Sequence, residues 1–347
     1  MSDNNKLVAD GLQEIRRRLP EGWKLEEQRG RTRGARDTYA RIVAPDRRSA
    51  SLAVEARRQL DPRAALGLLA QLREARAAEP VLVMARYLSP SVRERLREGE
   101  VSFVDLAGNA RVVLQSPGLF IEAAGADRNP DRKQRPARSL RGAKAGRLAR
   151  ALIDFRDPPG VRELALRAKV DAGYASRILA LLDGEALISR VGRGRIERVD
   201  WARLLRRWAQ DAPFESRGRT VSFIEPRGLP ALLERLAKST MRYAVTGSAA
   251  AARIAPVAPS RLATLYVTDA RAAAEQLGLR VADAGANVLL VEASDEGVFE
   301  RARTGDGISY AAPSQVAADL LTSPGRAPAE AEELIAWMAE HEEEWRG

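Results

Sequence analysis

A short predicted helix and the hairpin that follows it carry the residues of this chain best suited to bind a polyanion. The apolar residues of 174–184 recur with helical spacing and leave the first turn of the helix exposed. Residues 187–201 read LISRVGRGRIERVDW, the pattern of two strands joined by a glycine-flanked tip. Arginine can donate two parallel hydrogen bonds to guanine or bind a phosphate as a permanent cation. We therefore expect a cationic face that consists of Tyr174, Ser176, Arg177, Arg190, Gly192, Arg193, Gly194 and Arg195.

Two further helices are predicted ahead of this face. One lies within residues 144–153, and the next begins after Gly160 and ends at a short turn, residues 169–173. Asp171 can cap the third helix, because a short acidic side chain accepts hydrogen bonds from the backbone amides at a helix start. When a helix-turn-helix docks on DNA, the N-terminal residues of its second helix enter the major groove. Residues 144–210 therefore predict a winged helix-turn-helix whose third helix reads bases and whose hairpin contacts the DNA backbone or the minor groove.

The distribution of charge favours the same partner. The 347 residues include 57 Lys and Arg and 47 Asp and Glu, which gives a net charge of +10. Residues 125–220 hold 23 basic and 12 acidic residues, a net +11, whereas residues 1–124 carry +5 and residues 221–347 carry −6. Concentrated positive charge is typical of a surface that binds nucleic acid. The alternative is that an arginine-rich composition reflects a GC-rich genome. Arg138 and Arg141, which precede the first helix, are further candidate DNA contacts.

Acidic residues near the N-terminus have a second chemical interpretation. Asp37 falls in one predicted strand, and Glu55 and Arg57 fall in the next. This spacing resembles the PD-(D/E)xK nucleases, which implies that two carboxylates hold a divalent metal that activates water. Arginine stands here at the place of the lysine, and it stays protonated and cannot readily exchange a proton. We expect a nuclease-like α/β domain over 1–124 without activity, and if it is active, its catalytic residues would be Asp37, Glu55 and Arg57.

Two other motifs contain polar residues for which we expect no catalytic role. Asp105, Gly108 and Asn109 stand between two predicted strands, where a tight turn is the expected structure. Residues 246–248, Thr-Gly-Ser, resemble the entry of nucleotidyltransferases, which would next require paired aspartates for metal and triphosphate. The following strand offers Asp269 alone. We therefore expect a nucleotidyltransferase-like α/β fold over 221–347 without catalysis, and neither a metal nor a cofactor.

The predicted elements define an α/β multidomain chain. Breaks are expected at 125–143, a basic linker, and at 211–220, because these stretches combine proline, charge and a lack of apolar periodicity. Expected helices lie near 4–19, 62–78, from 89 onward, 229–238 and 328–345. Expected strands are 37–44, 50–56, 80–87, 101–106, 110–115, 118–124, 262–267 and 287–292.

A family resemblance covers roughly the last 200 residues. It is carried by GYASRILALLDGEALISRVGRGRIERVDWARLLRRWA in the stretch from Gly160 to Trp208, and by YAVTGSAAAARIAP, LATLYVTD and SYAAPSQVAADLLTSPGRAPAEAEELIAW further on. These segments resemble regulators of the AbiEi type, the antitoxins of type IV toxin–antitoxin systems. The resemblance implies a winged-helix transcriptional regulator that binds DNA and often represses its own operon. It also implies a possible protein partner, a toxin, for the C-terminal domain.

Composition excludes several other classes. Cysteine is absent and His341 is the single histidine, so thiolate or histidine metal sites and Ser-His triads are not expected. No apolar run reaches the roughly 18 residues of a membrane helix, and the N-terminus lacks a secretion pattern. We expect a cytoplasmic bacterial protein. The leading hypothesis is a sequence-specific regulator that binds double-stranded DNA, and the alternatives are a metal-dependent nuclease or nucleotidyltransferase and an antitoxin that binds a toxin. No heptad pattern announces a dimer. A further hypothesis is that the acidic residues of 328–347 shield the basic middle domain.

Overall fold

The structure is a computed structural model that describes residues 3–29, 38–74, 79–127, 139–191, 195–257 and 259–347. The chain divides into two compact units. Unit 1 is Met1–Ala137 with Gly184–Ala186, and unit 2 is Arg138–Asp183 with Leu187–Gly347. The α/β class expected for the whole chain is confirmed, since each unit contains a seven-stranded sheet. Within the described ranges, no helix combines the length and the apolar character that a membrane crossing needs.

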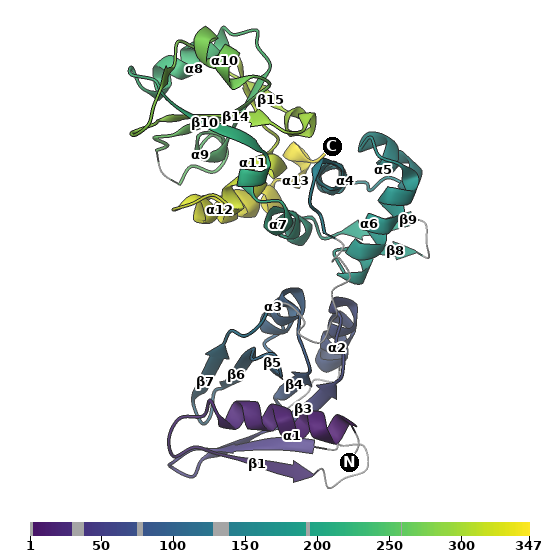
Figure 1. Ribbon diagram of the computed structural model, residues 1–347. Helices are drawn as coiled ribbons and strands as arrows, with labels where there is room; N and C mark the ends of the chain where they lie inside the picture. Colours follow the sequence, from purple (N-terminus) through teal and green to yellow (C-terminus); the bar gives the residue numbers. More distant parts are fainter. Residues whose placement is uncertain (1–2, 30–37, 75–78, 128–138, 192–194, 258) are drawn as a thin grey trace. The chain divides into compact units, whose positions relative to one another are not determined.

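The sheet of unit 1 follows the order of the chain from one edge to the other (Figure 1). Its outer strands pair antiparallel with their neighbours, and its central strands β3, β4 and β5 are parallel. Parallel neighbours need a crossover, and helices α2 (Pro62–Glu74) and α3 (Pro90–Glu98) supply the two crossovers. The strands are β1 (Lys24–Arg29), β2 (Thr38–Val43), β3 (Ser49–Arg57), β4 (Val81–Ala85), β5 (Ser102–Asp105), β6 (Ala110–Leu114) and β7 (Leu119–Ala123).

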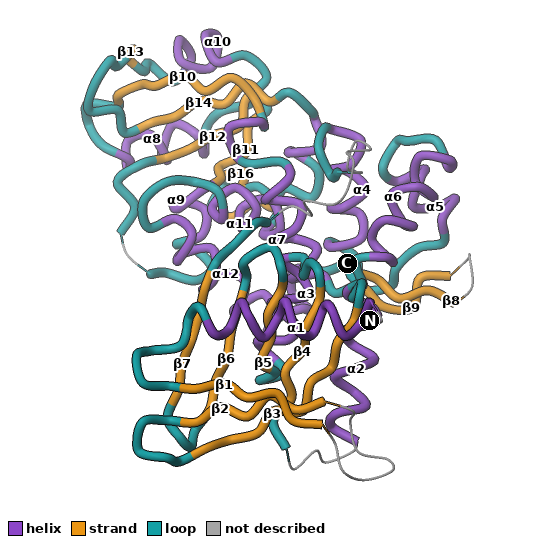
Figure 2. Tube along the Cα trace, turned by 60° about the horizontal axis from the view of Figure 1, so that its bottom comes forward, coloured by secondary structure: helices purple, strands orange, loops and turns teal. Residues whose placement is uncertain are grey.

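Helices cover both faces of this sheet, which explains the uninterrupted apolar run of β4. Leu82 and Met84 pack in one apolar cluster with the helix α1 (Asp3–Arg16). Val81 and Val83 point to the opposite face and pack in a second cluster with α2 and α3. Successive side chains of a strand alternate between the faces, so a strand that is covered twice must be apolar throughout. Figure 2 shows α1 lying across the strands.

The residues Asp105, Gly108 and Asn109 form the predicted turn. The Asp105 carboxylate is fully buried and accepts four hydrogen bonds of 2.9 Å, from the amides of Leu88, Ala107 and Asn109 and from the Asn109 side chain. Gly108 has a φ of 96°, which favours glycine. All the acceptor capacity of Asp105 therefore serves to hold the turn and the start of α3 in place.

Unit 2 begins with a helix–hairpin segment, residues 139–212. Its three helices and two-stranded antiparallel hairpin follow the predicted order, and a fourth helix that was not expected comes after the hairpin. The predicted inward residues Leu148, Leu164, Ile178 and Leu182 are all buried in its core. The elements are α4 (Ala143–Ile153), α5 (Val161–Arg167), α6 (Ala172–Gly184), β8 (Ile188–Val191), β9 (Arg195–Val199) and α7 (Trp201–Asp211).

A second seven-stranded sheet follows, in the order β13-β10-β14-β12-β11-β16-β15. Its strands are β10 (Gly218–Ile224), β11 (Tyr243–Thr246), β12 (Ala263–Val267), β13 (Arg280–Val281), β14 (Val288–Ala293), β15 (Arg303–Gly305) and β16 (Ile308–Tyr310). The helices are α8 (Leu229–Ala237), α9 (Gly247–Ala251), α10 (Ala270–Gln276), α11 (Pro313–Leu321), α12 (Ala327–Glu340) and α13 (Glu342–Trp345), with the short 3-10 turns η1 (Phe214–Ser216) and η2 (Glu296–Phe299).

The helix–hairpin segment and this sheet share one core. A single apolar cluster extends from Leu140 to Trp345. Its centre is α11, in which every residue from Pro313 to Leu320 is buried, and α7 and α12 pack against α11 (Figure 1). The break expected at 211–220 contains η1 and the beginning of β10, with packed structure on both sides.

The structure corrects one predicted helix and adds strands. The single helix expected at 328–345 is wrong, because α12 and α13 are separated at His341. The imidazole of His341 stacks on Trp337 with ring centroids 4.6 Å apart, and its Nδ1 lies 2.9 Å from the Trp337 carbonyl oxygen. The strands that were not expected are β1, β10, β11, β13, β15 and β16.

Candidate nucleic-acid interface

The first turn of α6 presents the polar residues that the helical spacing predicted. The Asp171 carboxylate accepts a 2.7 Å hydrogen bond from the Tyr174 amide, so Asp171 caps the helix as expected. Ala175, Ile178 and Leu179 are buried beneath the turn. Ser176 and Arg177 are exposed, and Tyr174 is half-buried. The turn therefore rests on an apolar base and directs a hydroxyl and a guanidinium into solvent.

Arg177 is held beside an aromatic ring and keeps its charge available. Its guanidinium carbon lies 5.8 Å from the centroid of the Tyr174 ring, within reach of a cation–π interaction. It forms no ion pair with any residue that the structure describes. Partial burial raises the pKa of the Tyr174 phenol further above its ordinary value of 10.0. A tyrosine hydroxyl is protonated at neutral pH in any case, so it can donate a hydrogen bond. The pair can thus present a cation and a donor together.

The basic hairpin divides into residues with different roles. Arg190 points from β8 to α6, where its guanidinium lies 3.3 Å from Asp183, and its side chain is only 10% exposed. This ion pair withdraws Arg190 from the cationic face that we expected, because an arginine buried against a carboxylate has little charge left for a phosphate. Arg195 is exposed at the start of β9. The tip residues Gly192, Arg193 and Gly194 lie outside the described residues.

The structure describes one of the two candidate arginines that precede α4. Arg138 lies outside the described residues. Arg141 is exposed, and its Nε donates a 3.1 Å hydrogen bond to the carbonyl oxygen of Asp211 at the end of α7. Because this bond uses a neutral acceptor, Arg141 retains its charge beside the ends of the helix–hairpin segment.

Arg150, a buried residue of α4, binds the helix–hairpin segment to the loop that contains η2. Arg150 forms a 3.0 Å ion pair with Asp154 and donates to the carbonyl oxygens of Gly297 and Glu300. Asp154 also accepts a hydrogen bond from Ser314 of α11. These contacts are almost fully enclosed, so they define the orientation of α4 relative to the sheet.

One residue of α4 extends this anchoring to the end of α5. Arg147 pairs with Asp295, and its Nε donates a 2.8 Å hydrogen bond to the carbonyl oxygen of Ala168. Ala168 directly precedes the turn that leads into α6. The start of α6 is therefore held through Arg147 to the C-terminal part of unit 2.

A polar network inside unit 2 joins the sheet to α7. Asp319 of α11 is 1% exposed and accepts hydrogen bonds from Thr246 (2.6 Å), Tyr266 (2.8 Å) and Gln315 (2.8 Å). Arg217 lies 3.3 Å from the same carboxylate and stacks 4.1 Å from the ring of Trp208. Burial raises the pKa of Asp319, and the positive charge of Arg217 opposes that change.

The acidic residues near the end of the chain do not pair with the exposed turn of α6. Glu332 pairs with Arg206 of α7, and Glu343 lies 3.3 Å from Arg156. Glu342 accepts a 2.6 Å hydrogen bond from the indole of Trp201. Among the described residues these carboxylates contact α7 and the loop after α4, both within residues 144–210, and they do not reach Arg177. The tail therefore neutralises part of the basic segment, and its effect on DNA affinity stays a prediction.

The candidate catalytic residues are occupied by structural contacts. Glu55 lies 2.7 Å from Arg57 on the same strand, and Asp37 lies outside the described residues. Asp269 caps α10 by accepting a 2.9 Å hydrogen bond from the Ala272 amide, and Thr246 donates to Asp319. Within the described part of the chain, no three acidic or histidine side chains gather as a metal site would require.

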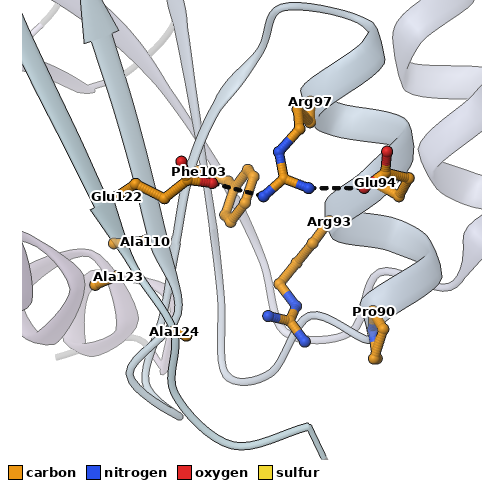
Figure 3. Close-up of a pocket in the computed structure, with 9 residues that line it drawn as sticks. All are labelled: Pro90, Arg93, Glu94, Arg97, Phe103, Ala110, Glu122, Ala123 and Ala124. Carbon is orange, nitrogen blue, oxygen red and sulfur yellow. Dashed lines mark hydrogen bonds and ion pairs between the residues drawn. The ribbon is translucent and has the colours of Figure 1, made fainter. Parts of the chain in front are cut away.

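A hollow with charged walls lies in unit 1 between α3 and the strands β5 to β7 (Figure 3). Its volume is about 200 Å³, and Arg97 crosses it between Glu122 (2.6 Å) and Glu94 (2.7 Å). Arg93 bonds to Asn109 and to Asp127. Both arginines are therefore paired with carboxylates of unit 1, although the buried Nε of Arg93 has no hydrogen-bond partner among the described residues.

Comparison of the chain with protein-family models, with curated proteins and with solved structures finds no match. Function therefore has to be inferred from the residues and their geometry.

Proposed function

We propose that this protein is a transcriptional regulator that binds double-stranded DNA through a winged helix-turn-helix. In this proposal α5 and α6 form the helix-turn-helix, α6 is the recognition helix, and β8 with β9 forms the wing. The observation that carries the proposal is the exposed first turn of α6, where Arg177 stands uncompensated beside Ser176 and Tyr174. A guanidinium that no carboxylate neutralises keeps its full charge for a base or a phosphate.

Each group has a chemical role in this proposal. Arg177 donates to the O6 and N7 atoms of a guanine in the major groove, while Ser176 and Tyr174 donate to a base edge or a phosphate. Arg195 binds the DNA backbone, together with Arg193 at the tip of the wing. The anchoring of α4 by Arg147 and Arg150 supports the proposal, because a recognition helix must be held rigidly to select one sequence.

The other parts of the chain are proposed to lack catalysis. We propose a nuclease-like fold without nuclease activity for unit 1, supported by the pairing of Glu55 with Arg57. For the C-terminal part of unit 2 we propose a nucleotidyltransferase-like fold, whose Asp269 serves as a helix cap. The resemblance of residues 160–208 to AbiEi-type regulators is in keeping with DNA binding as the shared function.

The proposal is tested by selecting bound genomic fragments and footprinting them with the full chain. We expect a protected site with a defined sequence, and a logarithm of the binding constant that falls linearly with the logarithm of salt concentration. The slope should be about −0.9 for each phosphate contact. Absence of any protected site, together with binding that salt does not weaken, would contradict the proposal.

Replacing Arg177 with alanine should weaken binding to the selected site by about 1–3 kcal/mol, roughly 5- to 150-fold, and relax the preference at one base pair. The loss arises because the forked donor to guanine disappears while the rest of the face remains. Competition binding against single-base variants of the site measures both effects. Arg271→Ala is the matched control, because the side chain of Arg271 is 88% exposed on α10 and, among the described residues, pairs with Glu275 alone. Equal losses in the two variants would exclude Arg177 from recognition.

A further inference from the structure

The wing contains an irregularity that the sequence analysis did not identify. Arg195 pairs with Val191 and Ile196 pairs with Arg190, but Arg198 then pairs with Ser189 and Val199 with Ile188. Glu197 is left without an opposite residue on β8, which is the definition of a β-bulge. The register therefore shifts by one residue in the middle of β9.

This shift decides which side chains face solvent. In a regular strand, residues three apart point to opposite faces, so Arg195 and Arg198 would be on different sides of the hairpin. The extra residue places both on the outer face. Ile196 is 1% exposed and Val199 packs against the core, whereas Arg195 and Arg198 are both exposed.

We infer that Arg198 is a further DNA-contacting residue, and that the bulge at Glu197 exists to bring it onto the same face as Arg195. This inference rests on the proposed function. Arg198 forms no ion pair or hydrogen bond with any residue for which the structure gives a position. Because of the bulge, Arg195 and Arg198 lie opposite Val191 and Ser189, which are two residues apart on β8. The two side chains therefore start roughly 7 Å apart along the strand, which allows them to contact separate phosphates of one duplex. Such contacts increase affinity for every sequence alike and carry no base preference.

The expected ligand is the phosphate backbone of duplex DNA beside the recognition site. Glu197 is exposed next to Arg198, and its negative charge repels a phosphate. Residues 195–198 therefore contribute two cations and one anion. The contribution of Arg198 is therefore measured best as a change in the number of phosphate contacts. That number, unlike the affinity, does not depend on the repulsion between Glu197 and the phosphate.

The test is the salt dependence of DNA binding by the full chain, with Arg198→Ala, Arg198→Lys and a control, Arg280→Ala. Arg280 is an exposed strand arginine on β13, in the sheet of unit 2. We expect Arg198→Ala to reduce the magnitude of the salt slope by about 0.9, to weaken binding to all sequences alike, and to leave the selected sequence unchanged. Arg198→Lys should restore the slope, because lysine keeps the charge. Arg280→Ala should match the unaltered chain.

The outcomes separate this inference from the proposed function. A normal slope for Arg198→Ala, with binding still weakened by Arg177→Ala, overturns the role of Arg198 and leaves DNA recognition intact. Loss of affinity without a change of slope also overturns it, since that result indicates a structural effect. If the unaltered chain shows no salt-dependent binding, the proposed function itself has failed. If Arg198→Ala lowers the melting temperature, the salt slopes of Arg198→Lys and Arg198→Gln are compared, because both variants retain a long polar side chain. A smaller slope for Arg198→Gln than for Arg198→Lys supports the phosphate contact, and equal slopes overturn it.

Discussion

Replacing Asp319 with alanine is expected to lower the free energy of unfolding of unit 2 by about 3–5 kcal/mol. The carboxylate is enclosed and is the common acceptor for Thr246, Tyr266 and Gln315. It also neutralises Arg217, whose side chain is 8% exposed. Removing one partner of a buried ion pair leaves the other charge without compensation, and that cost exceeds the value of the pair itself.

Urea denaturation followed by tryptophan fluorescence measures this loss, since four of the five tryptophans, all except Trp23, lie in unit 2. The matched control is Asp283→Ala, which removes an exposed aspartate from the same unit. We expect a lower midpoint for Asp319→Ala alone. Equal midpoints for the two variants would show that the network contributes little to the stability of unit 2.

The same residue predicts a dependence of stability on pH. Burial raises the pKa of Asp319 above its ordinary value of 3.8, so the folded state binds the proton more tightly than the unfolded state. The part of the stability that comes from protonating Asp319 is therefore complete below the ordinary pKa and is lost as the pH rises through the higher folded value. Asp319→Asn cannot titrate, so the difference in unfolding free energy between the unaltered chain and this variant should change across that interval. A constant difference from acid to neutral pH would rule out this coupling.

Replacing Trp208 with alanine is the second substitution with a large expected effect, about 3–5 kcal/mol of unfolding free energy. Trp208 is 2% exposed, and it joins three parts of unit 2. Its indole lies against Gly146 of α4, where an added Cβ would approach Nε1 to 3.3 Å. The guanidinium carbon of Arg217 lies 4.1 Å from the centroid of the Trp208 ring. A cavity here would separate α4 and α7 from α11, so we expect DNA binding to weaken along with stability.

The variant Trp208→Phe distinguishes the contribution of the packed ring volume to stability from that of the indole N–H. The indole N–H has no hydrogen-bond partner among the described residues, so replacing it with a hydrocarbon ring removes an unsatisfied donor. We expect a smaller loss of stability than for alanine, because most of the ring volume remains. Denaturation midpoints and DNA affinities of the two variants, with Phe120→Ala as a surface control in unit 1, provide the comparison. A loss as large in the phenylalanine variant would point to the indole N–H instead of the packed volume.

The amino-acid sequence was sufficient to predict the elements whose signals are local. The helical spacing of Ile178, Leu179 and Leu182 placed α6 and its exposed first turn correctly, and Asp171 was recognised as a possible cap. The same spacing could not separate α12 from α13, because apolar periodicity continues across His341. Strands such as β15 and β16 were missed because three residues are too few for an alternating pattern to emerge.

The sequence shows that the predicted wing contains several arginines, but only the tertiary structure shows which of them are buried and which are exposed. Arg190 and Arg198 have the same chemistry in the sequence, yet one is buried against Asp183 and the other is exposed by the bulge at Glu197. The difference depends on cross-strand register and on a carboxylate seven residues away on α6, and neither is encoded in local periodicity. For the same reason the network around Asp319 could not be foreseen, since its members are brought together from four separate segments by packing against α11. Local spacing determines which face of an element is apolar, whereas tertiary contacts decide which polar group on the opposite face remains free to bind.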